Sequence, residues 1–232
     1  MNFPDLFDAF DAAVLPPGLP DAVILRLRHD TVARELAAGE QLDLDPARAY
    51  FAFLGAGACK LAAFVSSARE QIVSFHFTGD VVHVPAQGRY GFTLTALTDA
   101  QLLVIPAESL NRSGPDSCGM LRLASRETEN ALARSRETSI ILGRRSAQER
   151  VASFILAIWD RLGADSRGEG WIDLPMSRGE IADSLGLTIE TVSRQFSELR
   201  DLGLIETEGR SALRVIDLPG LSRCAGQLPV AA

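Results

Sequence analysis

The stretch that decides the fold runs from residue 177 to residue 194 and reads Ser-Arg-Gly-Glu-Ile-Ala-Asp-Ser-Leu-Gly-Leu-Thr-Ile-Glu-Thr-Val-Ser-Arg. Its first four residues have the form of a capping box, in which a serine oxygen caps the third amide and a glutamate reaches back. They predict a short helix that ends at Leu185. Gly186 then predicts a tight turn, and Thr188 caps a second helix that extends to about residue 201. A short helix, a glycine turn and a longer helix form the outline of a helix-turn-helix motif.

The second helix of this motif has two faces of different character. One carries an apolar stripe that should pack against the rest of its domain, formed by Ile189, Val192, Phe196 and Leu199. The other presents Glu190, Ser193 and Arg194 within the first two turns. In helix-turn-helix proteins that part of the helix enters the major groove, where arginine bonds guanine and glutamate accepts from cytosine. A plain solvated face is the alternative for these three residues alone. The turn and both capping signals favour base reading.

The segment that follows predicts a wing. Two short strand patterns, at 203–207 and 212–216, flank a turn at 208–211 and predict a β-hairpin. Arg178 and Arg210 are placed to meet DNA phosphates, which position a protein without specifying sequence. Ser177, Thr188 and Thr191 are the other residues predicted to contact the DNA backbone. Residues 177–214 hold five arginines and seven acidic residues. Affinity should therefore rest on a few arranged arginines and on dimerisation.

Two helices are predicted upstream of the motif. A capping box at 146–149 begins one of them, and a long stretch rich in Ala, Leu, Glu and Arg at 116–142 predicts the other, about 40 Å long. A heptad through the long helix gives a partly apolar seam of Leu121, Ser125, Thr128, Leu132, Ser135, Ser139 and Leu142. Periodicity alone leaves open whether this helix lies across its own domain or forms a dimer contact.

The N-terminal half has a different pattern of apolar and turn residues. From residue 36 to 105, short apolar stretches such as 50–54 and 72–77 alternate with turn residues, which predicts a β-sandwich or roll. Glycines at 39, 55, 57, 79, 88 and 91 are expected to supply turns. Residues 5–14 and 20–30 look helical. We therefore expect an α+β chain with a β-roll at 1–115, a long helix at 116–143 and a winged helix-turn-helix domain at 144–232.

Bulk composition narrows the class of protein. The 232 residues are 47% hydrophobic and carry a net charge of −7, which argues against indiscriminate adhesion to nucleic acid. No apolar run approaches the roughly eighteen residues of a transmembrane helix, and the acidic start does not resemble a signal peptide. We expect a cytoplasmic protein with no membrane contact. Three distant cysteines provide neither a disulfide framework nor a zinc or redox pair.

The sequence resembles the Crp/Fnr superfamily of bacterial regulators, in the FNR and FixK-like branch but without the N-terminal cysteine cluster. The resemblance is carried by residues 176–182 and 185–194, with the branch-specific Glu-x-x-Ser-Arg pattern, and by residues 38–40, 75–80, 103–106 and 145–150. It implies a cyclic-nucleotide-binding-like β-roll, a dimerisation helix at 116–143 and a homodimer on a TTGAT…ATCAA-type palindrome. Arg194 would take the guanine, Glu190 the opposite cytosine and Ser193 the thymine region. It also implies a contact with RNA polymerase and an activator role.

The resemblance implies little about a signal. An FNR-type iron–sulfur cluster needs four cysteines, and residues 1–58 contain none. Cyclic-nucleotide members carry a glutamate and an Arg-Ser or Arg-Thr pair, where this chain has Asp80 and Arg89-Tyr90-Gly91. His83 lies near a haem-ligand position of haem-sensing members. A regulator gated by a cyclic nucleotide or haem is thus the alternative, and our leading hypothesis is that no cofactor is bound.

Two further alternatives concern reactive side chains. Cys118 is a candidate redox switch if its thiolate is exposed, but a buried, inert thiol is the favoured interpretation. Cys59 is expected in the core. A cupin-like metalloenzyme would need several histidines and a carboxylate around one metal, and His76 with His83 does not make that set. We therefore expect no metal and no enzyme activity.

Overall fold

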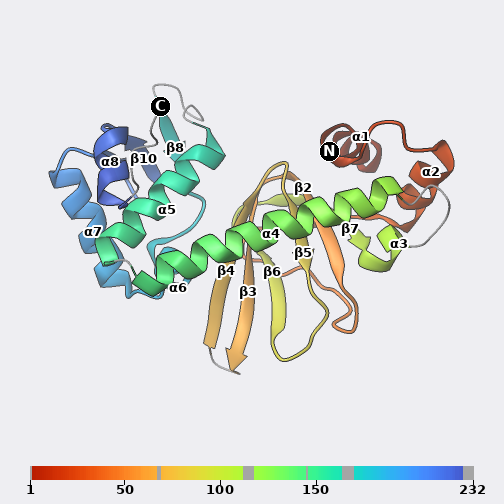
Figure 1. The fold of residues 1–232 in the computed structure, drawn as a ribbon, viewed down its shortest axis with the longest axis horizontal. Helices are drawn as coiled ribbons and strands as arrows, with labels where there is room; N and C mark the ends of the chain where they lie inside the picture. The colour runs from red at the N-terminus through yellow and green to blue at the C-terminus, as the bar shows by residue number, and fades with distance from the viewer. Residues whose placement is uncertain (1, 67–68, 112–117, 145, 164–169, 227–232) are drawn as a thin grey trace. The chain divides into compact units, whose positions relative to one another are not determined.

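The chain is described from a computed structural model (Figure 1) that covers residues 2–66, 69–111, 118–144, 146–163 and 170–226. For residues 65, 66, 69, 111, 118–124, 137 and 144 only the backbone is described. The chain forms two compact units, residues 1–133 and 134–232.

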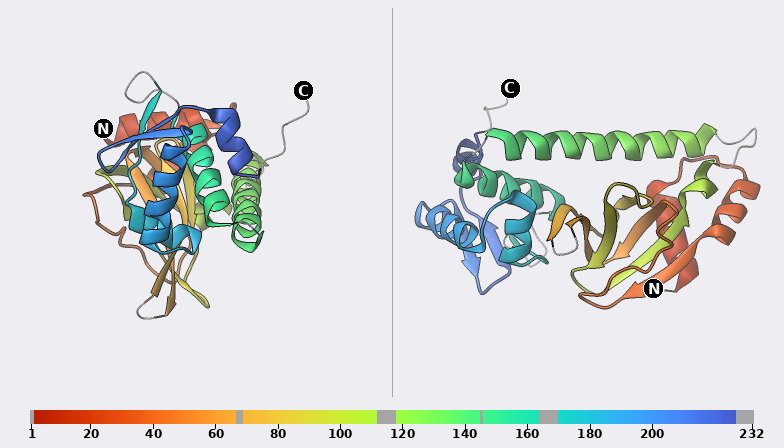
Figure 2. Two further views of the ribbon diagram at one scale, coloured as in Figure 1. Left: turned by 90° about the vertical axis from the view of Figure 1, so that its left-hand side faces the viewer. Right: turned by 90° about the horizontal axis from the view of Figure 1, so that it is seen from below.

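The first unit contains two antiparallel sheets that form the predicted β-roll. One has the strand order β1 (Val32–Leu36), β7 (Ala100–Pro106), β2 (Tyr50–Ala56), β5 (Val81–Val84). The other has the order β4 (Arg69–Phe77), β3 (Ala58–Ser66), β6 (Gly91–Ala96). The strands stand side by side in the centre of Figure 1 and are seen from another direction in Figure 2.

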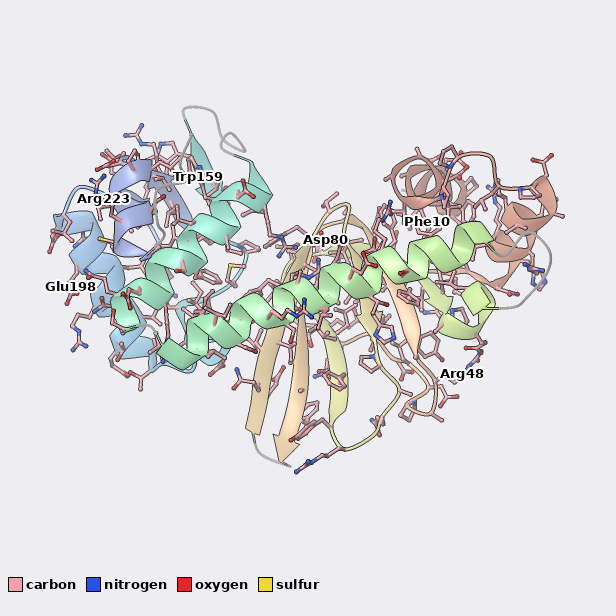
Figure 3. The ribbon with its side chains drawn as sticks, viewed as in Figure 1. Phe10, Arg48, Asp80, Trp159, Glu198 and Arg223 are labelled. Atoms are coloured by element: carbon pink, nitrogen blue, oxygen red, sulfur yellow. The ribbon has the colours of Figure 1, made fainter. Side chains whose placement is uncertain are left out.

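The alternation of side chains along β2 explains the two cores of this unit. Ala52 and Leu54 point into the roll, where they join apolar residues of both sheets, among them Leu61 and Leu94. Phe53, between them in sequence, points to the opposite face of the sheet. There it meets the N-terminal helices α1 (Phe3–Val14) and α2 (Asp21–Asp30). Phe10 of α1, labelled in Figure 3, has its ring 5.4 Å from that of Phe53.

The glycines of the roll serve two different purposes. Gly57 has φ +89° and passes so close to Asp99 and Ala100 that a Cβ would lie 2.3 Å from the Asp99 carbonyl oxygen. Gly55 does not supply a turn, contrary to expectation. It lies inside β2, where a Cβ would lie 1.9 Å from Cδ1 of Leu6. Absence of a side chain there lets α1 approach the sheet. Gly91 likewise belongs to a strand, β6.

Helix α3 (Ala107–Asn111) precedes the long helix α4 (Cys118–Arg144), which confirms the predicted helix over its described length. The seam residues Ser125, Thr128, Leu132, Ser135, Ser139 and Leu142 are all exposed in the single chain. The division between the two units falls within α4, and the domain limits at 115 and 143 stay predictions. In the described part of the chain, no helix is long and apolar enough to cross a membrane.

Besides the end of α4, the described residues of the second unit form four helices and a small sheet. The helices are α5 (Ala147–Leu162), α6 (Arg178–Leu185), α7 (Ile189–Asp201) and α8 (Leu218–Cys224), and the sheet has the order β8 (Trp171–Asp173), β10 (Ala212–Val215), β9 (Ile205–Glu208). Val151, Ile155 and Ile181 are buried in its core. The predicted hairpin is confirmed as β9 and β10. Strand β8 and helix α8 were not predicted.

Candidate nucleic-acid interface

The first helix of the motif begins as the sequence predicts. Ser177 is the N-cap of α6, and its hydroxyl oxygen accepts from the backbone N–H of Glu180 at 3.2 Å. The Glu180 carboxylate accepts in return from the backbone N–H of Ser177 at 2.8 Å. It also accepts from the Ser177 hydroxyl at 2.9 Å. This closed set of bonds satisfies donors that a helix start leaves unpaired, so the position of α6 is well defined.

The turn depends on a left-handed residue, and glycine provides it. Gly186 has φ +63° and ψ +41°, and its N–H and that of Leu187 both donate to the carbonyl of Ala182. Thr188 then caps α7 by accepting from the N–H of Thr191 at 3.2 Å. The two threonine hydroxyls lie 3.1 Å apart. Both helices of the motif are therefore fixed at their starts by their own side chains.

The buried side of α7 differs from the predicted stripe at one residue. Val192, Phe196 and Leu199 are buried as expected, but Ile189 is 53% exposed. The residue of α6 that lies next to Ile189 is Gly179: a Cβ at Gly179 would lie 3.5 Å from Cδ1 of Ile189. Because glycine has no side chain, α6 leaves Ile189 uncovered there. Gln195, which no apolar spacing would indicate, is buried instead, with 5% exposure.

The predicted reading face is exposed at the start of α7. Glu190, Ser193 and Arg194 are all exposed. Hydrogen bonds from its own backbone N–H and from Thr188 lower the pKa of the Glu190 carboxyl, which therefore remains an anionic acceptor at neutral pH. The Arg194 guanidinium pairs with Glu198, labelled in Figure 3, at 3.7 Å. Both side chains of that pair are solvated, so the ion pair is weak and Arg194 can turn toward another partner.

The two arginines predicted to meet phosphates have different surroundings. Arg210 is exposed in the turn of the wing, after Gly209 with φ +60°. Arg178 is half-buried, and its Cζ lies 3.3 Å from the ring centroid of Phe196. Burial lowers the pKa of Arg178 to about 10, so it is still a cation at neutral pH. The stack joins the start of α6 to the middle of α7, a contact that sequence spacing did not indicate.

The wing holds its own ion pair. Arg214 of β10 donates to the Glu206 carboxylate of β9 at 2.5 Å, and its Cζ lies 5.2 Å from the ring of Trp171 on β8. This arginine is thereby committed to the sheet. Among the five arginines of residues 177–214, Arg194, Arg200 and Arg210 thus extend into solvent without a described contact that joins two elements.

The polar candidates of the roll have structural partners. His76 is buried, with Nε2 2.8 Å from the Ser74 hydroxyl and Nδ1 3.7 Å from the Asp80 carboxylate. Asp80 also accepts from the N–H of Phe77. His83 is exposed on β5, 5.0 Å from the ring of Phe51. The described side chains contain no group of three that could hold a metal ion. Gating by a cyclic nucleotide or haem stays an untested alternative.

The structure describes the side chain of one of the two cysteines considered above, Cys59, but not that of the other, Cys118. Cys59 is fully buried on β3, and burial raises the pKa of its thiol to about 12. This confirms its place in the core. The side chain of Cys118 lies outside the described residues, so its redox role stays a prediction.

Comparisons with known proteins agree with this geometry. Residues 149–224 match the model of the Crp-like helix-turn-helix domain. The chain is 33% identical over 198 residues to a probable transcriptional activator of Rhizobium leguminosarum, covering 85% of this chain and 82% of that protein. It is 36% identical over 149 residues to the nitrogen fixation regulation protein FixK of Bradyrhizobium diazoefficiens, covering 64% and 63%. The solved structure of FixK2 from Bradyrhizobium japonicum is also similar, with TM-score 0.75 and 28% identity over 87% of this chain and 99% of that one.

A β-roll joined to a capped, winged helix-turn-helix defines a DNA-binding transcription regulator, and not an enzyme. More narrowly, the chain belongs to the Crp/Fnr family, with the character of its FixK and FNR members. The fold class expected from the sequence is thereby confirmed.

Proposed function

We propose that this chain binds a TTGAT…ATCAA-type palindrome as a homodimer and activates transcription from it in the cytoplasm. The observation that carries the proposal is the exposed face of Glu190, Ser193 and Arg194 at the start of a helix capped by Thr188. Arg194 donates to the guanine, Glu190 accepts from the opposite cytosine and Ser193 lies near the neighbouring thymine. The FixK similarity supports this assignment.

Phosphate contacts set the register of the motif on the duplex. Ser177, Thr188 and Thr191 stand at the starts of α6 and α7, where helix N-termini favour anions. Arg178 presents its charge from a fixed place on Phe196, whereas Arg210 reaches from the wing. These five residues would orient the protein without reading sequence.

The exposed seam of α4 supports the homodimer. Of its leucines, Leu132 is 47% and Leu142 37% exposed, and every heptad position whose side chain is described, from Ser125 to Leu142, faces solvent in one chain. Exposed leucines that recur along the seam of a long helix favour a contact in which a second copy covers them. Two copies related by a two-fold axis would present two reading helices to the two halves of a palindrome.

The test of this function is binding to matched duplexes. Fluorescence anisotropy should show specific binding to the palindrome, weaker binding when one half-site is scrambled, and only salt-sensitive background when both are scrambled. Sedimentation should give two chains per palindrome. Equal affinity for all three duplexes, or one chain per duplex, would contradict the proposal.

A matched pair of variants addresses the seam. Leu132→Arg should weaken dimerisation because it places a charge in the contact, whereas Leu25→Arg should not, since Leu25 is 66% exposed on α2 and lies outside the seam. Sedimentation equilibrium measures the difference. An unchanged dimer with Leu132→Arg would remove α4 as the contact.

Activation requires contact with RNA polymerase. In a purified transcription reaction with RNA polymerase holoenzyme, a promoter carrying the palindrome upstream should give more transcript when this protein is added. Less transcript, at a site that does not overlap the promoter, would replace activation by repression.

A further inference from the structure

One guanidinium in the second unit joins the ends of two helices. Arg150, in the first turns of α5, donates from Nη2 to the carbonyl of Leu142 at 3.0 Å. From Nη1 it donates to the carbonyl of Leu185 at 3.2 Å. Leu142 belongs to the last turn of α4, and Leu185 is the last residue of α6. The two contacts therefore link α4 to the helix-turn-helix through a single side chain.

Both acceptors, the carbonyl oxygens of Leu142 and Leu185, lie at the C-terminal ends of helices, where a cation such as the Arg150 guanidinium is favoured. The last carbonyls of a helix have no partner within it and carry the negative end of its dipole. Arginine suits two acceptors at once because its donors form a rigid planar fork, whereas lysine offers a single compact ammonium. Arg150 is half-buried; its bond to Leu185 is partly shielded from solvent, whereas its bond to Leu142 is exposed.

A second contact lies at the same junction. Cδ2 of Leu142 lies 3.9 Å from the position that a Cβ of Gly186 would occupy, which places the last turn of α4 against the turn of the motif. From there the structure is continuous to the reading face. Gly186 leads to the Thr188 cap of α7, and the Arg178 stack on Phe196 ties α6 to α7.

We propose that Arg150 is a positioning residue for DNA recognition: its fork fixes the direction of the reading helix relative to α4, and so sets the distance between the two reading helices of a dimer. The inference rests on the proposed homodimer, in which α4 is the contact. Arg150 itself need not touch DNA. Its loss should relax the preference for one half-site spacing and leave the reading of each base unchanged.

The test is a spacing series on the full chain. Anisotropy is measured on TTGAT…ATCAA duplexes whose spacer is lengthened or shortened in single base-pair steps. The wild type should prefer half-sites about one helical turn, roughly 10 bp, apart. Arg150→Gln should lose about tenfold in affinity at the best spacing, the effect of losing charge-assisted hydrogen bonds, and less at the others. The penalty for replacing the half-site guanine should not change.

Two further variants keep the result interpretable. Arg223→Gln on α8 removes a surface arginine that is 72% exposed, and it should leave the spacing curve as in the wild type. Arg150→Lys keeps the charge but not the fork, and it should fold normally while recovering little of the spacing preference. Circular dichroism and the active fraction by DNA titration establish that each variant is folded.

The outcomes separate the two proposals. A flattened curve with intact base discrimination supports the positioning role. A uniform loss at every spacing, no loss at all, or full recovery with Arg150→Lys overturns it while the homodimer stands. A wild type with no preferred spacing would overturn the proposed homodimer, and the role of Arg150 with it.

Discussion

The two ends of the molecule use polar side chains in opposite ways. In the second unit, residues 134–232 (the reading unit), Glu190, Ser193 and Arg194 face solvent from α7, whose start is capped by Thr188. In the roll, polar groups such as His76 and Asp80 are bound to their own sheet and turn, around an interior of apolar side chains. The comparison teaches that polarity alone does not indicate function: the polar groups of the roll are hydrogen-bonded within it, whereas those of α7 stay accessible to a partner.

The largest expected effect is a loss of stability in the roll that leaves the reading unit unchanged. Gly57→Ala should lower the free energy of unfolding of the roll by about 3 kcal/mol or more, because its Cβ would collide with the backbone of Asp99 and Ala100 at a positive φ. Gly79→Ala, also at positive φ but with open space around it, should cost only about 1 kcal/mol.

The two units can be followed separately in that experiment. Both tryptophans, Trp159 and Trp171, lie in residues 134–232, so their fluorescence reports the reading unit, while circular dichroism in the far ultraviolet includes the roll. Gly57→Ala should shift the unfolding transition seen by circular dichroism to milder conditions and leave the transition seen by tryptophan fluorescence unchanged. Equal costs for the two glycine variants would refute the close approach at Gly57.

A smaller effect distinguishes Arg178 from Arg210, the two arginines proposed to meet phosphates. Arg178→Ala should cost about 1–2 kcal/mol of stability through loss of the Phe196 stack, in addition to weakening DNA binding. Arg210→Ala should leave stability unchanged, because the side chain is exposed, and should lower the salt dependence of binding by about one unit of slope. Urea unfolding and salt titrations measure the two. Indistinguishable stability of the two variants would count against the stack.

The smallest expected effect concerns Cys59 of the roll, which should not react with thiol reagents in the native protein. With a pKa raised to about 12, the Cys59 thiol stays protonated at about pH 8, and thiol reagents attack the thiolate. In a Cys118→Ser background, half-buried Cys224 should be labelled first and Cys59 only on unfolding. Mass spectrometry of the labelled chain identifies the site. Prompt labelling of Cys59 in the native protein would mean that the roll interior opens.

How far the sequence predicts the structure depends on how local each signal is. Both capping boxes, the Gly186 turn and the wing lie within a few consecutive residues, and the structure confirms them. Ile189 was expected to be buried, but its exposure depends on Gly179, a residue of another helix. Gly55 was expected in a turn, but its role depends on Leu6, far away in sequence.

Contacts between elements escape sequence patterns for the same reason. The stack of Arg178 on Phe196 and the fork of Arg150 depend on how helices cross, which no spacing within one helix encodes. Strand β8 has three residues and exists only through its pairing with β10, so its own pattern is too short to predict it. Glu190, Ser193 and Arg194 could be grouped from the sequence because they share one helix, and base reading by them stays a prediction.

The most direct test of the central claim compares guanine with 7-deazaguanine in the half-site. The substitution removes the N7 acceptor and leaves the opposite cytosine for Glu190. Wild-type protein should lose about 1 kcal/mol of binding free energy on the modified duplex. Arg194→Ala should bind the unmodified site about 1–3 kcal/mol more weakly and should no longer distinguish the two duplexes. If Arg194→Ala weakens binding yet still pays the same penalty for 7-deazaguanine as the wild type, Arg194 touches only phosphate and does not read the base.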